Sequence, residues 1–239
     1  MTEKNSGKVI LQAFLIIIAA FLAAGVLTAL ISMVTYNSDP AVSVSRIIVS
    51  VILLVIFRKY LDSSKAFTGL KYILPGLAIV IWNIIMNLMT GGQISLDWPA
   101  VICLGSFAPA LFEEVLFRMI FINKMRSSGV SAVTAMIIPA VCFGLIHLTN
   151  ALSGDIVNAL IQTCYATVIG LLLGAIYIKS GDLISVILLH WMIDASSQIF
   201  TGGGTGSPVW LVLMAVLLAG ELFYAFRLAG TFDKSEFTE

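Results

Sequence analysis

The sequence predicts an all-α, polytopic membrane protein: a bundle of about eight transmembrane helices forming a single domain over residues 1–239. Of the 239 residues, 59% are hydrophobic and only 11% are charged, and the mean hydropathy is +1.05. Such values lie well outside the range of soluble globular domains. The formal net charge is zero, so the chain offers no basic surface for nucleic acid, which we exclude as a partner.

Apolar stretches long enough to cross a bilayer, which takes about 20 residues, recur along the whole chain. The first is too long for the core of a signal peptide and lacks a small-residue cleavage site, so we expect a retained helix. Short connections rich in Gly, Asn, Asp and Ser separate the stretches. The predicted spans are 9–36, 41–57, 72–89, 99–122, 131–149, 157–178, 183–200 and 208–226.

The basic residues orient this bundle, because cytoplasmic connections carry an excess of Lys and Arg. With both termini in the cytoplasm, only Arg46 falls on the opposite side, and Arg118 lies inside the fourth span. We therefore expect a multi-pass cell-membrane protein with cytoplasmic N and C termini. The residues that fit this orientation are Lys4, Lys8, Arg58, Lys59, Lys65, Lys71, Lys124, Arg126, Lys179, Arg227 and Lys234.

Ionisable residues inside the predicted spans point to a functional site. Each costs at least ~2.5–3.5 kcal/mol near the bilayer centre and therefore needs a partner or a water-filled cavity. Both histidines of the chain lie in spans and are accompanied by carboxylates, which favours a functional cluster over isolated core residues. The cluster consists of Glu113, Glu114 and Arg118 in the fourth span, His147 in the fifth, and His190 and Asp194 in the seventh.

Helical spacing predicts two pairs within this cluster. Glu114 and Arg118 are four residues apart and share a helix face, and so do His190 and Asp194. Glu113 projects about 100° away from Glu114, which leaves it without a partner in its own span. We expect Glu113 to find its partner on another helix or to be protonated.

The depths of these residues in the bilayer also agree. With a turn at residues 129–130, Glu113 and His147 each lie ~25 Å from the turn, provided that the fourth helix continues past Arg126. His190 lies ~12 Å from the start of its span, so the site falls in the cytoplasmic half. Pro109 is expected to kink the fourth helix beside the carboxylates and to widen a cavity.

Two chemistries suit this set of residues, and both lead to hydrolysis. A Zn²⁺ ion could be held in an open tetrahedral site, with Glu113, His147 and His190 as the candidate ligands. Alternatively, a glutamate could activate water directly without a metal. The sequence leaves both open.

Three short motifs are similar to those of the CAAX-protease and bacteriocin-processing (CPBP or Abi) family of intramembrane proteases. They are EExxxR at residues 113–118, FxxxH at residues 143–147 and HxxxD at residues 190–194, within a motif-bearing region of about residues 100–197. Their order, spacing and position in apolar spans make the combination specific. The resemblance implies an eight-helix bundle with an intramembrane site that opens to the cytoplasm.

The resemblance also implies roles for the residues and a class of substrate. Glu113 and His147 would activate the attacking water, and His190 with Asp194 would stabilise the oxyanion or help to hold a metal. Glu114 and Arg118 would support the site. The substrate would be a peptide or membrane-anchored protein cleaved near the cytoplasmic leaflet, as in relatives that process prenylated CAAX termini or bacteriocins, and the short chain suggests a bacterial member.

Two other functions fit the same residues. An ion- or proton-coupled transporter would use the cluster as a relay, which predicts polar residues along both halves of a path. The outer half offers little beyond Asn83, Asn87 and Gln162, and the two asparagines are better explained by hydrogen bonds between helices. A non-catalytic immunity or scaffold protein would have no need to insert so many polar groups.

Overall fold

The computed structural model describes residues 4–35, 38–202 and 208–232, and their fold is all-α, as predicted. The described strands are short, β1 (Gln93–Ile94) and β2 (Phe200–Thr201), and they pair antiparallel. Seven helices are continuous: α1 (Lys4–Thr35), α2 (Ser38–Ile56), α3 (Leu77–Met89), α7 (Ala132–Ile146), α8 (Ile156–Ser180), α9 (Leu183–Gln198) and α10 (Pro208–Ala229).

The fourth helical run changes its winding along its length. It comprises α4 (Trp98–Ala100), the π-helical η4 (Val101–Ser106), α5 (Phe107–Glu114), the π-helical η5 (Val115–Ile122) and α6 (Asn123–Arg126). Short 3₁₀ segments complete the structure: η1 (Arg58–Tyr60), η2 (Ser63–Lys65), η3 (Leu70–Tyr72) and η6 (His147–Ser153), the last of which continues α7. Each predicted span thus corresponds to one helical run.

Four of the described helices are long and apolar enough to cross a membrane: Gly7–Thr35, Ala132–Leu152, Ile156–Ser180 and Pro208–Ala229. The shorter apolar helices are Pro40–Ile56, Leu77–Met89 and Leu183–Gln198.

The third span starts later than predicted, at Leu77 rather than residue 72. Pro75 explains the difference, because a proline disfavours helical backbone at the residue before it. The number of crossings remains a prediction.

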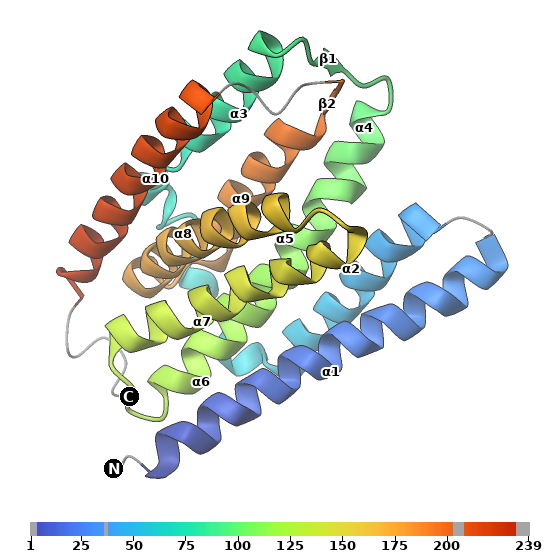
Figure 1. The fold of residues 1–239 in the computed structure, drawn as a ribbon. Helices are drawn as coiled ribbons and strands as arrows, with labels where there is room; N and C mark the ends of the chain where they lie inside the picture. Colours follow the sequence, from blue (N-terminus) through green and yellow to red (C-terminus); the bar gives the residue numbers. More distant parts are fainter. Residues whose placement is uncertain (1–3, 36–37, 203–207, 233–239) are drawn as a thin grey trace.

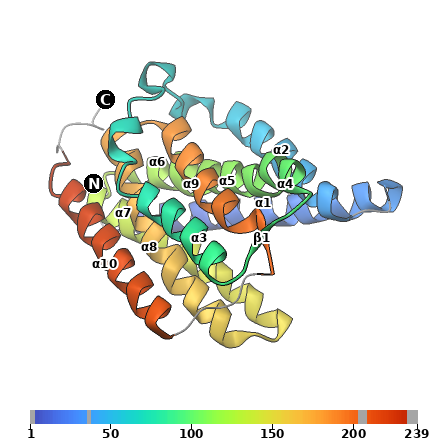
Figure 2. The same ribbon diagram turned by 90° about the horizontal axis from the view of Figure 1, so that it is seen from above.

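The fourth run forms the centre of the bundle, between α2 on one side and α9 on the other (Figures 1 and 2). Phe112 and all of residues 114–122 are buried. The α1 and α10 helices lie on the outside and expose large apolar side chains such as Leu22 and Phe223. In a membrane protein these outer faces are the ones that contact lipid.

The connections gather at two ends of the bundle. The first turn of α1, the last turn of α10 and the connection between α6 and α7 lie toward one end (Figure 1). As expected, a turn follows α6: Gly129 has a φ of +81°, which glycine adopts without strain, and Ser131 caps α7. The fourth run ends at Arg126, with Ser127 as its C-cap, slightly earlier than the depth argument required. Which side of the membrane this end faces remains a prediction.

Small residues allow α7 and α8 to approach closely. A Cβ atom on Gly170 would lie 3.1 Å from Cα of Ala140, and one on Gly174 would lie 3.5 Å from Met136. The small-residue pair of α8 therefore packs against α7. Gly144 of α7 is tighter still, because an added Cβ would lie 2.8 Å from the carbonyl oxygen of Thr163 and would overlap the Thr167 hydroxyl.

We predict that Gly144→Ala destabilises the protein by about 1–3 kcal/mol, because the new methyl group meets backbone that cannot move aside. Gly25→Ala on α1 is the matched control, since nothing lies within 4 Å of its added Cβ, and alanine favours helix by about 1 kcal/mol over glycine. Thermal unfolding in detergent tests both variants. Equal melting temperatures of the Gly144→Ala and Gly25→Ala variants would contradict the close α7–α8 contact.

Candidate active site

A buried ion pair anchors the site within the fourth run. The Arg118 Nε atom lies 3.0 Å from Glu114 Oε2, and these side chains are 1% and 0% exposed, respectively. This confirms the pair predicted from the four-residue spacing. Arg118 also donates from Nη2 to the carbonyl oxygen of Gly170 at 3.4 Å, and its guanidinium carbon lies 5.0 Å from the centre of the Phe143 ring. The arginine therefore holds α7 and α8 against the fourth run.

The second oxygen of Glu114 reaches α9. Its Oε1 accepts a hydrogen bond from Nδ1 of His190 at 2.8 Å, and the imidazole is 5% exposed. Because a paired carboxylate accepts but does not donate, Nδ1 carries the proton and the orientation of the ring is fixed. The sequence predicted the contact of Glu114 with Arg118 but not this one with His190.

Two further carboxylates face the other edge of the same imidazole. Nε2 of His190 lies 3.7 Å from Oε2 of Glu113 and 3.7 Å from Oδ2 of Asp194. Glu113 thus finds its partner on another helix, as expected, and the spacing of His190 and Asp194 brings them together. The Glu113 and Asp194 side chains are 14% and 25% exposed, so both can contact a substrate or a water molecule.

His147 stands where α7 passes into η6. Its Nδ1 lies 3.0 Å from the carbonyl oxygen of Phe143, which can only accept, so Nδ1–H is the donor. In the neutral imidazole the lone pair is then on Nε2. The Phe143 ring packs edge-on against both imidazoles, with centroids 5.0 Å from His147 and 5.7 Å from His190. These contacts give Phe143, the first residue of the FxxxH motif, a role in positioning both imidazoles.

A cavity of about 310 Å³ joins these groups. Glu113 and His147, predicted to lie at equal depth, both line it, together with His190 and Asp194. Pro109 also lies on its wall, one turn from Glu113 and just after the widened η4 segment. The remaining lining residues are Phe21, Arg46, Gly105, Ile146, Thr149, Asn150, Gln162 and Gln198.

Two ionisable residues in apolar helices were missed by the sequence reasoning. Arg46, the one exception to the predicted orientation, lines the cavity, and its position inside the second predicted span was the signal. Glu221 of α10 is 3% exposed and lies away from the cavity lining. The interhelical role predicted for Asn83 is confirmed, because its amide donates to the carbonyl oxygen of Ile193 at 3.1 Å. Asn87 instead bonds within α3, donating to the carbonyl oxygen of Asn83.

The side chains as placed do not fit a zinc ion. Nowhere in the described ranges do three His, Cys, Asp or Glu side chains converge in a way that could hold a metal, whereas a catalytic zinc needs three protein ligands. The candidate ligands Glu113, His147 and His190 line one cavity, but as placed they do not form such a group of three ligands.

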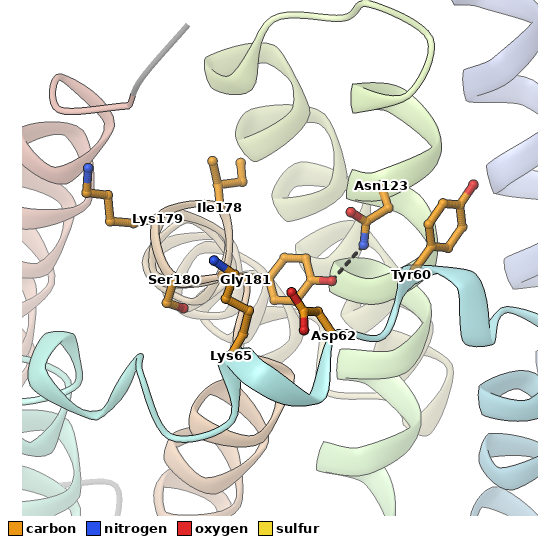
Figure 3. A pocket seen from close by; sticks show the side chains of 9 residues that line it. Tyr60, Asp62, Lys65, Asn123, Ile178, Lys179, Ser180 and Gly181 are labelled. Carbon is orange, nitrogen blue, oxygen red and sulfur yellow. Dashed lines mark hydrogen bonds between the residues drawn. The ribbon is translucent and has the colours of Figure 1, made fainter. Parts of the chain in front are cut away.

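A second cavity, of about 260 Å³, lies near the connection between α2 and α3 (Figure 3). Asn123 donates to the Tyr177 hydroxyl at 2.6 Å beside it. Hydrogen bonds from the Ser64 hydroxyl and amide keep the pKa of Asp62 below its usual range, so this carboxylate is ionised. The Lys179 side chain points away from the other lining residues in Figure 3. With one carboxylate and no histidine among its lining residues, this cavity lacks the acid–base set of the first.

The helical bundle and its buried acid–base cluster define a membrane-embedded protein with a site suited to hydrolysis. Residues 95–196 match the family model described as type II CAAX prenyl endopeptidase Rce1-like. The chain therefore carries an Rce1-like domain, and the resemblance drawn from the three motifs is confirmed, with nearly the predicted limits. The match supports a CAAX-type intramembrane protease in general. No curated protein and no solved structure matches the chain significantly.

We predict that Glu114→Gln lowers stability by about 3–5 kcal/mol, because it leaves the buried Arg118 guanidinium without its carboxylate. Glu113→Gln is the matched control, because the Glu113 side chain lines the cavity and lies beside His190, whereas the ion pair of Arg118 is with Glu114. Chemical or thermal unfolding in detergent measures both. A smaller loss for Glu114→Gln than for Glu113→Gln would contradict the supporting role of the ion pair.

Proposed function

We propose that this protein is an intramembrane endopeptidase that hydrolyses a peptide bond of a peptide or membrane-anchored protein substrate. One observation carries the proposal: the Glu113 carboxylate faces a cavity beside an imidazole that a fully buried ion pair holds in place. General acid–base catalysis needs a carboxylate of this kind, positioned and accessible.

In the proposed first step, Glu113 accepts a proton from a water molecule whose oxygen attacks the scissile carbonyl carbon. His147 lines the same cavity, and because its Nδ1–H bonds to the carbonyl oxygen of Phe143, its Nε2 is the nitrogen that accepts the second hydrogen bond of that water. The two groups together orient the attacking oxygen. The carbonyl oxygen becomes an oxyanion, which needs donors placed in advance.

In the second step, His190 acts as an imidazolium ion, in which both ring nitrogens carry a proton. Its Nε2–H donates to the oxyanion, while Glu114 holds Nδ1–H on the opposite edge of the ring. Asp194 lies 3.7 Å from Nε2 and balances the positive charge of the ring. Glu113 then passes its proton to the leaving nitrogen, the carbon–nitrogen bond breaks, and the products are a carboxylic acid and an amine. This sequence of steps uses no metal ion, in keeping with the poor fit for zinc.

The depth count from the sequence places the cleavage near the cytoplasmic leaflet. The cavity, however, extends from Glu113 toward Asn150 and Gln198, which lie at the bundle end away from the turns at Gly129 and Gly181. We therefore propose that the reacting groups lie near mid-depth and that the cavity opens toward this second end. With cytoplasmic termini, the opening faces the other side of the membrane.

Thiol labelling in oriented vesicles tests this direction. In a background with Cys103, Cys142 and Cys164 replaced by alanine, we predict that Gln198→Cys reacts with an impermeant maleimide added opposite the termini. Ser64→Cys, in the connection between α2 and α3, is the matched control and reacts from the side of the termini. Labelling of both residues from one side would contradict the proposed opening.

The catalytic prediction concerns purified protein and candidate membrane peptides. We expect Glu113→Gln and His147→Ala to lower cleavage by about 10²–10⁴-fold, because each removes a group that acts on the water. Cys164→Ala, at an exposed position of α8, is the control and keeps full activity. Equal cleavage by the wild type and both site variants would refute the site.

The same assay separates the two chemistries and the other candidate functions. We expect a zinc chelator to leave cleavage unchanged, and loss of activity restored by added zinc would show that the side chains rearrange around a metal. Proton or ion flux through the wild type without peptide cleavage would instead favour a transporter.

A further inference from the structure

Arg46 is a second charged arginine inside the bundle. It lies on α2, eight residues after the first residue of that helix, is half-buried, and lines the cavity together with Glu113, His147 and Asp194. A charge at such a position is costly to insert and is expected to have a partner. The contacts and catalytic steps described above do not involve the Arg46 side chain.

Arg118 and Arg46 differ in their surroundings. Arg118 is closed in by Glu114, Gly170 and the Phe143 ring. In the part of the chain that the structure describes, the Arg46 guanidinium forms no ion pair and no hydrogen bond, and only its backbone carbonyl is used, accepting from Ser50 at 2.6 Å. Asp194 lines the same cavity and interacts with the Arg46 charge, but they are not in contact. The guanidinium therefore remains available on the cavity wall.

We propose that Arg46 binds a carboxylate of the peptide substrate, which rests on the proposed function. A guanidinium offers planar, paired N–H donors that match a carboxylate. The carboxylates on this wall, Glu113 and Asp194, repel an anion once ionised. The two imidazoles are used by the attacking water and the oxyanion in the proposed mechanism, so Arg46 is the cation left to bind a substrate carboxylate. Binding there fixes how far the scissile bond lies from the carboxylate, and Arg46 thereby determines the cleavage position.

The carboxylate can come from a free carboxyl terminus or from an acidic side chain, and three probes distinguish these sources. They are an apolar fluorescent peptide of Ala, Leu and Val with a free carboxyl terminus, its carboxyl-terminal amide, and an amide that ends in glutamate. Affinities are measured with protein in nanodiscs of uncharged phosphatidylcholine. For the wild type we expect the free acid to bind about 10- to 100-fold more tightly than the amide.

Arg46→Gln is expected to remove this preference while leaving the affinity for the amide unchanged, which also shows that the variant is folded. Arg46→Lys keeps the charge without the paired donors and is expected to retain part of the preference, providing a second test if the glutamine variant is unstable. Arg58→Gln, in an exposed connection, is the control and keeps the full preference. Tight binding of the glutamate-ended amide would assign the recognised group to an acidic side chain.

Equal affinity of the wild type for acid and amide, or an unchanged preference in Arg46→Gln, would overturn the role of Arg46. Cleavage of the same peptides is followed in the same samples and tests the endopeptidase separately. Binding that depends on Arg46 without any cleavage would retain the carboxylate site and count against the proposed function. Cleavage without a carboxylate preference would support the proposed function and count against the role of Arg46.

Discussion

The carboxylate of Glu114 is the group on which the geometry of the site depends. It holds Arg118 with one oxygen and His190 with the other, so a single side chain ties the central helical run to α9 and fixes the orientation of the imidazole. Glu113 and Asp194 take their places relative to that ring, at 3.7 Å each. Without the Glu114 contacts, no other described hydrogen bond would fix this imidazole.

This arrangement is costly, because a buried ion pair rarely repays the free energy of removing both charges from water. Replacing such a pair with apolar residues of similar volume is often neutral or stabilising. A contribution to stability alone therefore does not explain why Glu114 and Arg118 are paired here. Their value lies in the fixed direction of His190, whose Nε2 edge is presented to the cavity while its Nδ1 edge is held from behind.

The sequence revealed what depends on spacing along one helix. The Glu114–Arg118 pair and the proximity of His190 to Asp194 follow from four-residue spacing, and the common depth of Glu113 and His147 follows from counting residues from the turn. The contact between Glu114 and His190 could not be predicted, because it depends on how α5 and α9 rotate and pack against each other. The late start of α3 could have been read from Pro75, a local effect that hydropathy alone concealed.

Arg46 shows how the same reasoning fails. The count of basic residues assigned Arg46 to one side of the membrane, although Arg46 lies within an apolar span. Arg46 was the one exception to the predicted orientation, and that exception indicated a role other than setting the orientation. The structure separates two arginines of identical chemistry by their neighbours: Arg118 has its carboxylate within its own helix, and Arg46 faces a cavity. An arginine enclosed by protein groups stabilises the fold, whereas an arginine that faces a cavity can bind a ligand. For Arg46, the packing of α2 against α5 determines that its side chain faces the cavity.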